Sequence, residues 1–192
     1  MNAMQAGFAD PVSDAQAAFR AVLDAMARPG RMAHFAAPTE MPPGLGRAAA
    51  ALALTLVDMD TPVWLSPACA SAADWLRFHC SARVAARPSA ARFAFATAAE
   101  CPPLANFDLG TNEYPDQSTT LILEVPSLVL GGALALRGPG IETVAQVGIA
   151  GLPSGFWGQR EMLHELFPRG LDIVFVAGET ALALPRTTRV EG

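Results

Sequence analysis

Residues 58–65 read Asp-Met-Asp-Thr-Pro-Val-Trp-Leu, so that a polar turn runs directly into three apolar residues. A short strand with apolar side chains on both faces is typical of a sheet that is covered on both sides, as in α/β proteins. Patterns typical of helices come before and after this strand. We therefore predict an α/β fold.

The first helix is predicted from its start and stop signals. Ser13 can cap it, Gln16 stands three residues later as a capping-box partner, and Pro29-Gly30 ends it. The spacing of its apolar residues predicts one buried face made of Phe19, Val22, Leu23 and Met26.

The other elements follow from the same patterns. Gly131-Gly132, directly before the strand at 133–137, is the strongest hairpin signal, and the prolines and glycines of 98–118 predict a long loop. Further helices are predicted to begin at Pro42-Pro43-Gly44 (alanine-rich and buried on several sides), Ser71 and Ser154, and further strands at 32–35, 92–96, 119–125, 173–177 and 181–184.

This order of elements predicts the architecture. Helices and strands alternate early and hairpins come late, which favours a three-layer αβα arrangement with a mixed central sheet and helices on both faces. Neither an internal repeat nor a linker divides the chain, so we expect a single domain over residues 1–192.

The charged residues exclude several classes of function. The net charge of −5 argues against broad nucleic-acid binding, and the 52% hydrophobic content argues against disorder. All 13 positive residues are arginine. Without lysine there can be no Schiff base to pyridoxal phosphate and no P-loop lysine, so we expect no such cofactor. Any anion must meet arginine, backbone N–H groups or a helix N-terminus.

The remaining composition predicts a cytoplasmic protein. The three cysteines are irregularly spaced without a Cys-x-x-Cys pair, so we expect free thiols and no structural metal site. No basic residue precedes Arg20, unlike the charged start of a secretory signal. The longest largely apolar run, residues 48–57, is far shorter than the roughly 20 residues of a membrane span.

The segment Pro185-Arg186-Thr187-Thr188-Arg189 is the most interesting candidate for a binding site. It places two guanidinium groups and two hydroxyl groups directly after the last predicted strand. Bidentate arginine suits a phosphate or a carboxylate of a partner, so Arg186, Thr187 and Thr188 are candidate ligand-binding residues. The alternative is a solvated tail at the end of the chain.

Three further groups carry weaker signals. Gly138 and Gly140 could bring backbone N–H groups to an anion, but a turn that simply ends a strand is the alternative. His79 could be a ligand-binding residue or general base, or could interact with the last carbonyl groups of its helix. Asp58 and Asp60 could hold magnesium through water, although aspartates in turns commonly bond their own backbone.

Short motifs do not identify a function for this chain, but its sequence as a whole resembles a known family. The chain resembles the PhnH family of the bacterial carbon–phosphorus lyase system for phosphonate breakdown. The resemblance rests on Phe19-Arg20, Pro29-Gly30, Leu54-Thr55-Leu56, Asp60-Thr61-Pro62-Val63-Trp64-Leu65, Arg77-Phe78-His79, Gly110-Thr111, Gly140-Ile141, Gly170-Leu171-Asp172 and Pro185-Arg186-Thr187-Thr188. The chain departs from the family pattern at Arg169, where leucine is usual.

The resemblance implies a fold like that of pyridoxal-phosphate-dependent transferases, without the cofactor. It also implies a homodimer within an assembly with the G, I and J subunits, and a requirement, together with the G, I and L subunits, for making ribose 1-phosphonate 5-triphosphate from ATP and a phosphonate. No catalytic residue can be transferred from the family.

These observations favour an accessory subunit that organises the phosphonate-processing complex and binds a phosphorylated ligand, with no activity of the isolated chain. Two alternatives stay open. One is an autonomous enzyme or ligand-binding protein for phosphorylated or phosphonate compounds that uses Arg186, Thr187 and His79. The other is a purely structural interaction module.

Overall fold

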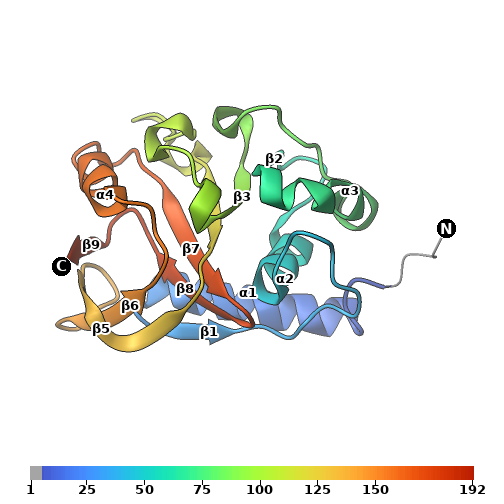
Figure 1. The fold of residues 1–192 in the computed structure, drawn as a ribbon, viewed down its shortest axis with the longest axis horizontal. Coiled ribbons are helices and arrows are strands. Elements are labelled where there is room, and N and C mark those ends of the chain that lie inside the picture. Colours follow the sequence, from blue (N-terminus) through green and yellow to red (C-terminus); the bar gives the residue numbers. More distant parts are fainter. Residues whose placement is uncertain (1–5) are drawn as a thin grey trace.

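The computed structural model describes residues 6–192 and contains a mixed six-stranded sheet at its centre (Figure 1). The strands in sheet order are β1 (Met32–His34), β8 (Thr180–Leu184), β7 (Asp172–Ala177), β4 (Thr120–Glu124), β3 (Phe93–Thr97) and β2 (Val63–Leu65). Strands β2, β3, β4 and β7 run parallel to one another, whereas β8 runs antiparallel to its neighbours β7 and β1. The predicted mixed sheet is confirmed.

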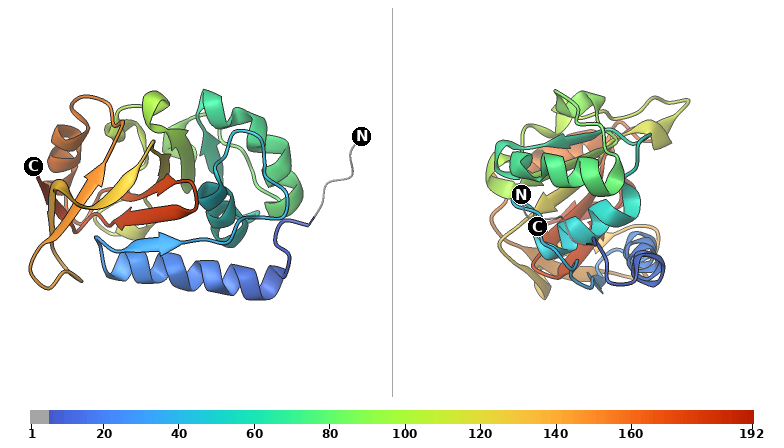
Figure 2. Two further views of the ribbon diagram at one scale, coloured as in Figure 1. Left: turned by 60° about the horizontal axis from the view of Figure 1, so that its bottom comes forward. Right: turned by 90° about the vertical axis from the view of Figure 1, so that its right-hand side faces the viewer.

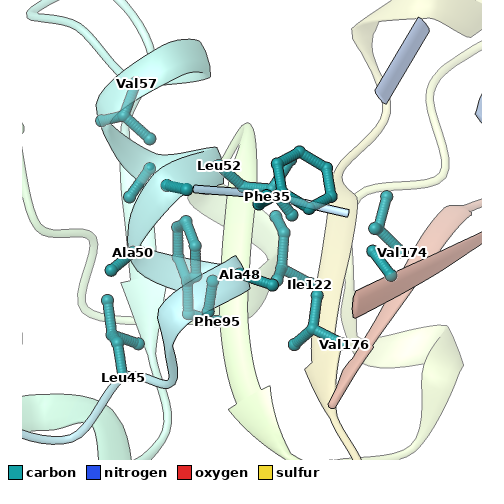
Figure 3. Close-up of a cluster of buried hydrophobic side chains, with 14 of the residues drawn as sticks. Phe35, Leu45, Ala48, Ala50, Leu52, Val57, Phe95, Ile122, Val174 and Val176 are labelled. Carbon is teal, nitrogen blue, oxygen red and sulfur yellow. The ribbon is translucent and has the colours of Figure 1, made fainter. Parts of the chain in front are cut away.

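One face of the sheet is covered by the helices α1 (Pro11–Ala27), α2 (Arg47–Leu56) and α3 (Ala73–Cys80). Figure 2 shows α1 lying beside β1. The residues at 48–53 in α2 are at most 2% exposed, as the alanine-rich pattern predicts, and they pack with Phe95, Ile122 and Val174 of the sheet (Figure 3).

The opposite face is covered by α4 (Phe156–His164) together with a second, three-stranded sheet. This sheet has the order β6 (Ala145–Ile149), β5 (Leu128–Arg137), β9 (Arg189–Glu191). Phe156 of α4 packs on Phe175 of β7, with ring centroids 6.0 Å apart. Helices therefore lie on both faces, but on this side α4 shares the layer with strands.

The hairpin prediction was wrong in its position. Gly131-Gly132 lies inside β5, where the register shifts between Leu130 and Leu134, and not at a turn. The hairpin connects β5 to β6, a strand that the sequence analysis missed, through residues 138–144. A Cβ at Gly132 would stand 2.3 Å from the backbone nitrogen of Gly148, so the glycine pair allows two backbones to approach.

The predicted helix starts also need correction. Asp10, not Ser13, caps α1, because its carboxylate accepts hydrogen bonds from the N–H groups of Val12 and Ser13 at 3.2 and 3.1 Å. The reciprocal bond from the Asp10 N–H goes to Asp14, not to Gln16. The helices α2, α3 and α4 begin at residues 47, 73 and 156, and a 3₁₀ turn precedes α3.

The predicted buried face of α1 is confirmed for Val22 and for Met26, which is partly buried against the core, but not for Phe19 and Leu23. Ala18, Val22 and Ala25 are buried, whereas Phe19 and Leu23 are 50% and 56% exposed. Because α1 packs closely against α2 and β8, small side chains face the core. Two large apolar side chains are therefore left on the surface.

Candidate functional site

A cleft runs between α4 and the C-terminal segment that follows β8, at the end of the molecule where Figure 1 shows α4 beside β9. It consists of two adjoining cavities of about 180 and 430 Å³. Both cavities are lined by His164, Glu165 and Arg189. The smaller one is also lined by Arg160 and Thr188, and the larger one by Pro139, Phe167 and Thr187. We call this the α4 cleft.

Arg160 of α4 is only 3% exposed, although it lines the smaller cavity. Its Nη2 donates to the carbonyl oxygens of Pro185 and Thr188 at 2.7 and 3.4 Å, and its Nε has no hydrogen-bond partner among the residues the structure describes. Burial lowers the pKa of Arg160 to about 10, Asp172 opposes this shift, and Arg186 adds to it. The side chain therefore remains a cation at neutral pH.

Arg186 lies beside the cleft, but its guanidinium group is engaged inside the protein. Its Nη2 donates to Asp172 Oδ2 at 2.5 Å and to Ser118 Oγ at 2.7 Å, its Nε donates to Asp172 Oδ1 at 3.3 Å, and its Nη1 donates to the carbonyl of Pro115. Arg186 thus ties the C-terminal segment to β7 and to the long loop before β4. The predicted role in ligand binding would require these bonds to be exchanged.

The two threonines after Arg186 differ in their surroundings. Thr188 is 1% exposed, and its Oγ1 has no partner among residues 6–192. Thr187 is partly exposed and lines the larger cavity. The segment is therefore folded into the protein and is not a solvated tail.

His164 connects α4 to the C-terminal segment through both ring nitrogens. Its Nε2 lies 3.0 Å from the Nε of Arg189, which can only donate, so Nε2 accepts. The proton must then sit on Nδ1, which lies 3.2 Å from the carbonyl oxygen of Arg186 and donates to it. In this state His164 positions Arg189 and has no free lone pair for general-base catalysis.

The Gly138-Pro139-Gly140 turn lies next to the segment that contains Arg186. A Cβ at Gly138 would stand 3.0 Å from the carbonyl oxygen of Thr187, and one at Gly140 would stand 2.0 Å from that of Ala27. Both glycines have positive φ, at 144° and 80°. The fold therefore brings these two predicted groups together, and close backbone approaches account for the glycines.

His79 is not part of the α4 cleft. It lies on α3, which packs on the opposite face of the sheet, with its ring centroid 4.6 Å from that of Trp75 and 4.9 Å from that of Phe78. Its Nε2 has no hydrogen-bond partner among residues 6–192, and burial lowers its pKa while Glu40 opposes the shift. The structure therefore separates His79 from the other candidates.

Asp58 and Asp60 form the turn that the alternative interpretation describes. The Asp58 carboxylate accepts bonds from the Asp60 N–H at 2.9 Å and from the Thr61 hydroxyl at 3.0 Å. Within residues 6–192, no group of three or more His, Cys, Asp or Glu side chains is placed to hold a metal ion.

Arg160 and His164 are site residues that the sequence analysis missed, whereas Arg189 belongs to the predicted segment but was not named as a ligand-binding residue. One signal was available, because helical spacing puts Arg160 on the same face as Phe156 and Leu163, and a charge on an apolar face is unusual. The contact of His164 with Arg189 joins residues 25 positions apart, which no local pattern indicates.

Comparison with known proteins agrees with the resemblance seen in the sequence. The model of the bacterial phosphonate metabolism protein PhnH matches residues 6–191. The chain belongs to the PhnH family. It is 46% identical, over 187 residues, to a protein of Rhizobium meliloti (strain 1021) named alpha-D-ribose 1-methylphosphonate 5-triphosphate synthase subunit PhnH, covering 96% of this chain and 94% of that protein.

A more distant relative has a related description. The putative C-P lyase subunit protein HtxG of Stutzerimonas stutzeri is 31% identical over 177 residues, covering 91% of this chain and 85% of HtxG. Membership of the PhnH family thus places the chain in phosphonate metabolism. None of the helices described within residues 6–192 is long and apolar enough to cross a membrane.

Proposed function

We propose that this chain is a subunit of the carbon–phosphorus lyase complex that makes ribose 1-methylphosphonate 5-triphosphate. The observation that carries the proposal is the 46% identity, over nearly the full length of both proteins, to the PhnH subunit of that synthase. The second relative, described as a C-P lyase subunit, supports the same role.

Within that complex the chain is an accessory subunit that organises other subunits and does not carry out the chemistry alone. The hydrogen bonds of His164 favour positioning over proton transfer, and a chain without lysine cannot hold pyridoxal phosphate as a Schiff base. The proposal includes a cytoplasmic homodimer, contacts with the G, I and J subunits, joint action with the G, I and L subunits, and a fold like that of pyridoxal-phosphate-dependent transferases.

The surface of α1 supports a role in assembly. Val12, Phe19 and Leu23 are 67%, 50% and 56% exposed and follow one another at spacings of seven and four residues, which places them on one face of the helix. Large apolar side chains grouped on a surface are typical of sites that another protein covers. We assign this face to contacts with other subunits of the complex.

Co-purification with the G, I and J subunits tests the proposal. The chain is expected to co-purify with them and to be required for the phosphonate-dependent release of adenine from ATP. A double variant with Phe19→Ser and Leu23→Ser is expected to reduce recovery of the complex by about tenfold, because each substitution removes an apolar side chain from the proposed contact surface. Met59→Ser is the matched control, because Met59 is 63% exposed but lies in the turn before β2.

Two results would contradict different parts of the proposal. If the unaltered chain neither associates with the other subunits nor is needed for adenine release, the role in the complex is wrong. If the double variant and Met59→Ser both assemble normally, the complex uses another surface.

A further inference from the structure

Among residues 6–192, Arg186 has an ion-pair partner and the buried Arg160 has none. Asp172 pairs with Arg186 at 2.5 Å, and no ion pair joins Arg160 to a carboxylate among residues 6–192. Buried charges in proteins are normally paired, since removing them from water is costly. The positive charge of Arg160 is therefore incompletely balanced within the described chain.

A second buried group in the same cavity lacks a partner. Thr188 and Arg160 are both lining residues of the smaller cavity, and the buried atoms Thr188 Oγ1 and Arg160 Nε have no hydrogen-bond partner within the described residues. Buried polar groups without partners are rare in proteins and call for an explanation. The cavity, at about 180 Å³, offers the volume of about six water molecules at ~30 Å³ each.

A third donor stands at the mouth of the cleft. Arg189 is exposed, lines both cavities and donates to His164 through its Nε. Because the bond to His164 holds the Nε edge, the rest of the guanidinium can face a ligand. The carboxylates that line the same cleft belong to Glu161 and Glu165, which are exposed, and to Glu191, which pairs with Arg137.

We infer that the α4 cleft binds a phosphoryl or phosphonyl anion, which Arg160 and Thr188 contact at its floor and Arg189 contacts at its mouth. A tetrahedral oxyanion accepts hydrogen bonds from guanidinium and hydroxyl groups. The positive charge of the guanidinium groups also offsets the negative charge of the anion. The cavity admits a group of the size of phosphate or methylphosphonate. Only the choice of phosphonate as a ligand rests on the proposed function, since the anion site itself rests on this geometry.

Calorimetric titration of the purified full chain tests the inference. Inorganic phosphate, methylphosphonate and acetate are titrated separately at constant ionic strength, because a carboxylate of a partner subunit could satisfy the same arginines. Phosphate and methylphosphonate are expected to bind at millimolar concentration or below, and acetate at least about tenfold more weakly. Wild-type protein that binds none of these anions at millimolar concentration would overturn the inference.

Thr188→Val is the sharpest variant, because it removes the hydroxyl and preserves the shape of the side chain. Because Oγ1 has no partner within residues 6–192, the variant is expected to fold at least as stably as the wild type and yet to bind the anion about tenfold more weakly. Arg189→Gln is expected to weaken binding to a similar degree, and Arg160→Gln to abolish it. Arg47→Gln is the control, since Arg47 pairs with Glu179 outside the cleft.

The outcomes separate three possibilities. Equal binding of acetate and phosphate would show that the cleft recognises a carboxylate, and would overturn the phosphoryl assignment. If the Thr188→Val and Arg189→Gln variants bind phosphate and methylphosphonate as tightly as the wild type, the site is wrong. This holds even if Arg160→Gln fails to fold. Co-purification with the other subunits reads out the proposed function independently, so a chain that assembles but binds no anion contradicts only this inference.

Discussion

Replacing Arg186 by glutamine is expected to destabilise the fold strongly. Its guanidinium group donates to Asp172, to Ser118 and to the carbonyl of Pro115, and the side chains of Arg186 and Asp172 are only 14% and 18% exposed. The substitution removes the cation and leaves a largely buried carboxylate. The cost of that carboxylate, more than the loss of the bonds themselves, sets the size of the effect.

The magnitude follows from the partners that remain. Removing one member of a buried ion pair costs about 3–5 kcal/mol. Asp172 keeps one partner, because the backbone N–H of residue 186 donates to its Oδ1 at 2.7 Å, so we expect about 3 kcal/mol, at the lower end of that range. For a chain of this length, that corresponds to a melting temperature lower by about 6–12 °C.

Urea unfolding monitored by circular dichroism measures this free energy, with Arg137→Gln as the matched control. Arg137 pairs with Glu191 on the surface, with side chains 52% and 61% exposed, and should lose less than about 1 kcal/mol. Adding Asp172→Asn to Arg186→Gln should restore part of the stability, since the buried charge is gone. If Arg186→Gln unfolds at the wild-type urea concentration, the structural role of Arg186 is wrong and its bonds are free to serve a ligand.

Three other perturbations test the local structure. Gly140→Ala is expected to lower the free energy of unfolding by more than about 2 kcal/mol, because its Cβ would stand 2.0 Å from a carbonyl oxygen of α1. Gly155→Ala, at φ 78° in open space, should lower it by about 1 kcal/mol. Equal melting temperatures of the two variants would contradict this. Asp10→Ala should lower the free energy of unfolding by about 1 kcal/mol, because Asp10 caps α1. Ser13→Ala should lower it by less. Burial lowers the pKa of His79 from its ordinary value of 6.5, so its contribution to stability is complete above about pH 6.5 and is lost as the pH falls below it. His79→Gln should therefore flatten the dependence of the unfolding free energy on pH below pH 6.5, and an unchanged slope would refute this.

The central sheet could be predicted because each of its strands is signalled locally. Val63-Trp64-Leu65 and the strand at 120–124 are apolar on both faces, and both became buried parallel strands between two layers. The second sheet could not be predicted in the same way. Its strand β9 has only three residues and is ordered by pairing with Leu136 and its neighbours in β5, more than 50 residues earlier in the chain.

The buried face of α1 shows a different limit. The periodicity of apolar residues indicates a face, but it does not say whether large or small side chains point inward. Here the alanines of α2 allow a close approach, so Ala18 and Ala25 face the core, and Phe19 remains outside. The prediction for Phe19 and Leu23 was wrong because it used only the hydrophobicity of the side chains, whereas the distance between the helices decides which side chains fit.

In this lysine-free chain some arginines stabilise the fold, and by our inference others bind an anion. The two roles differ in how many nitrogen atoms of the guanidinium group are hydrogen-bonded within the protein. Every guanidinium nitrogen of Arg186 is hydrogen-bonded within the protein. Arg160, which lines a cavity, bonds through Nη2, and its buried Nε has no partner among residues 6–192. The sequence gives no sign of this difference, because the partners Pro115, Ser118 and Asp172 become neighbours only in the folded chain. A buried arginine with donors left over is the one to test for a ligand, and here that residue is Arg160 rather than Arg186.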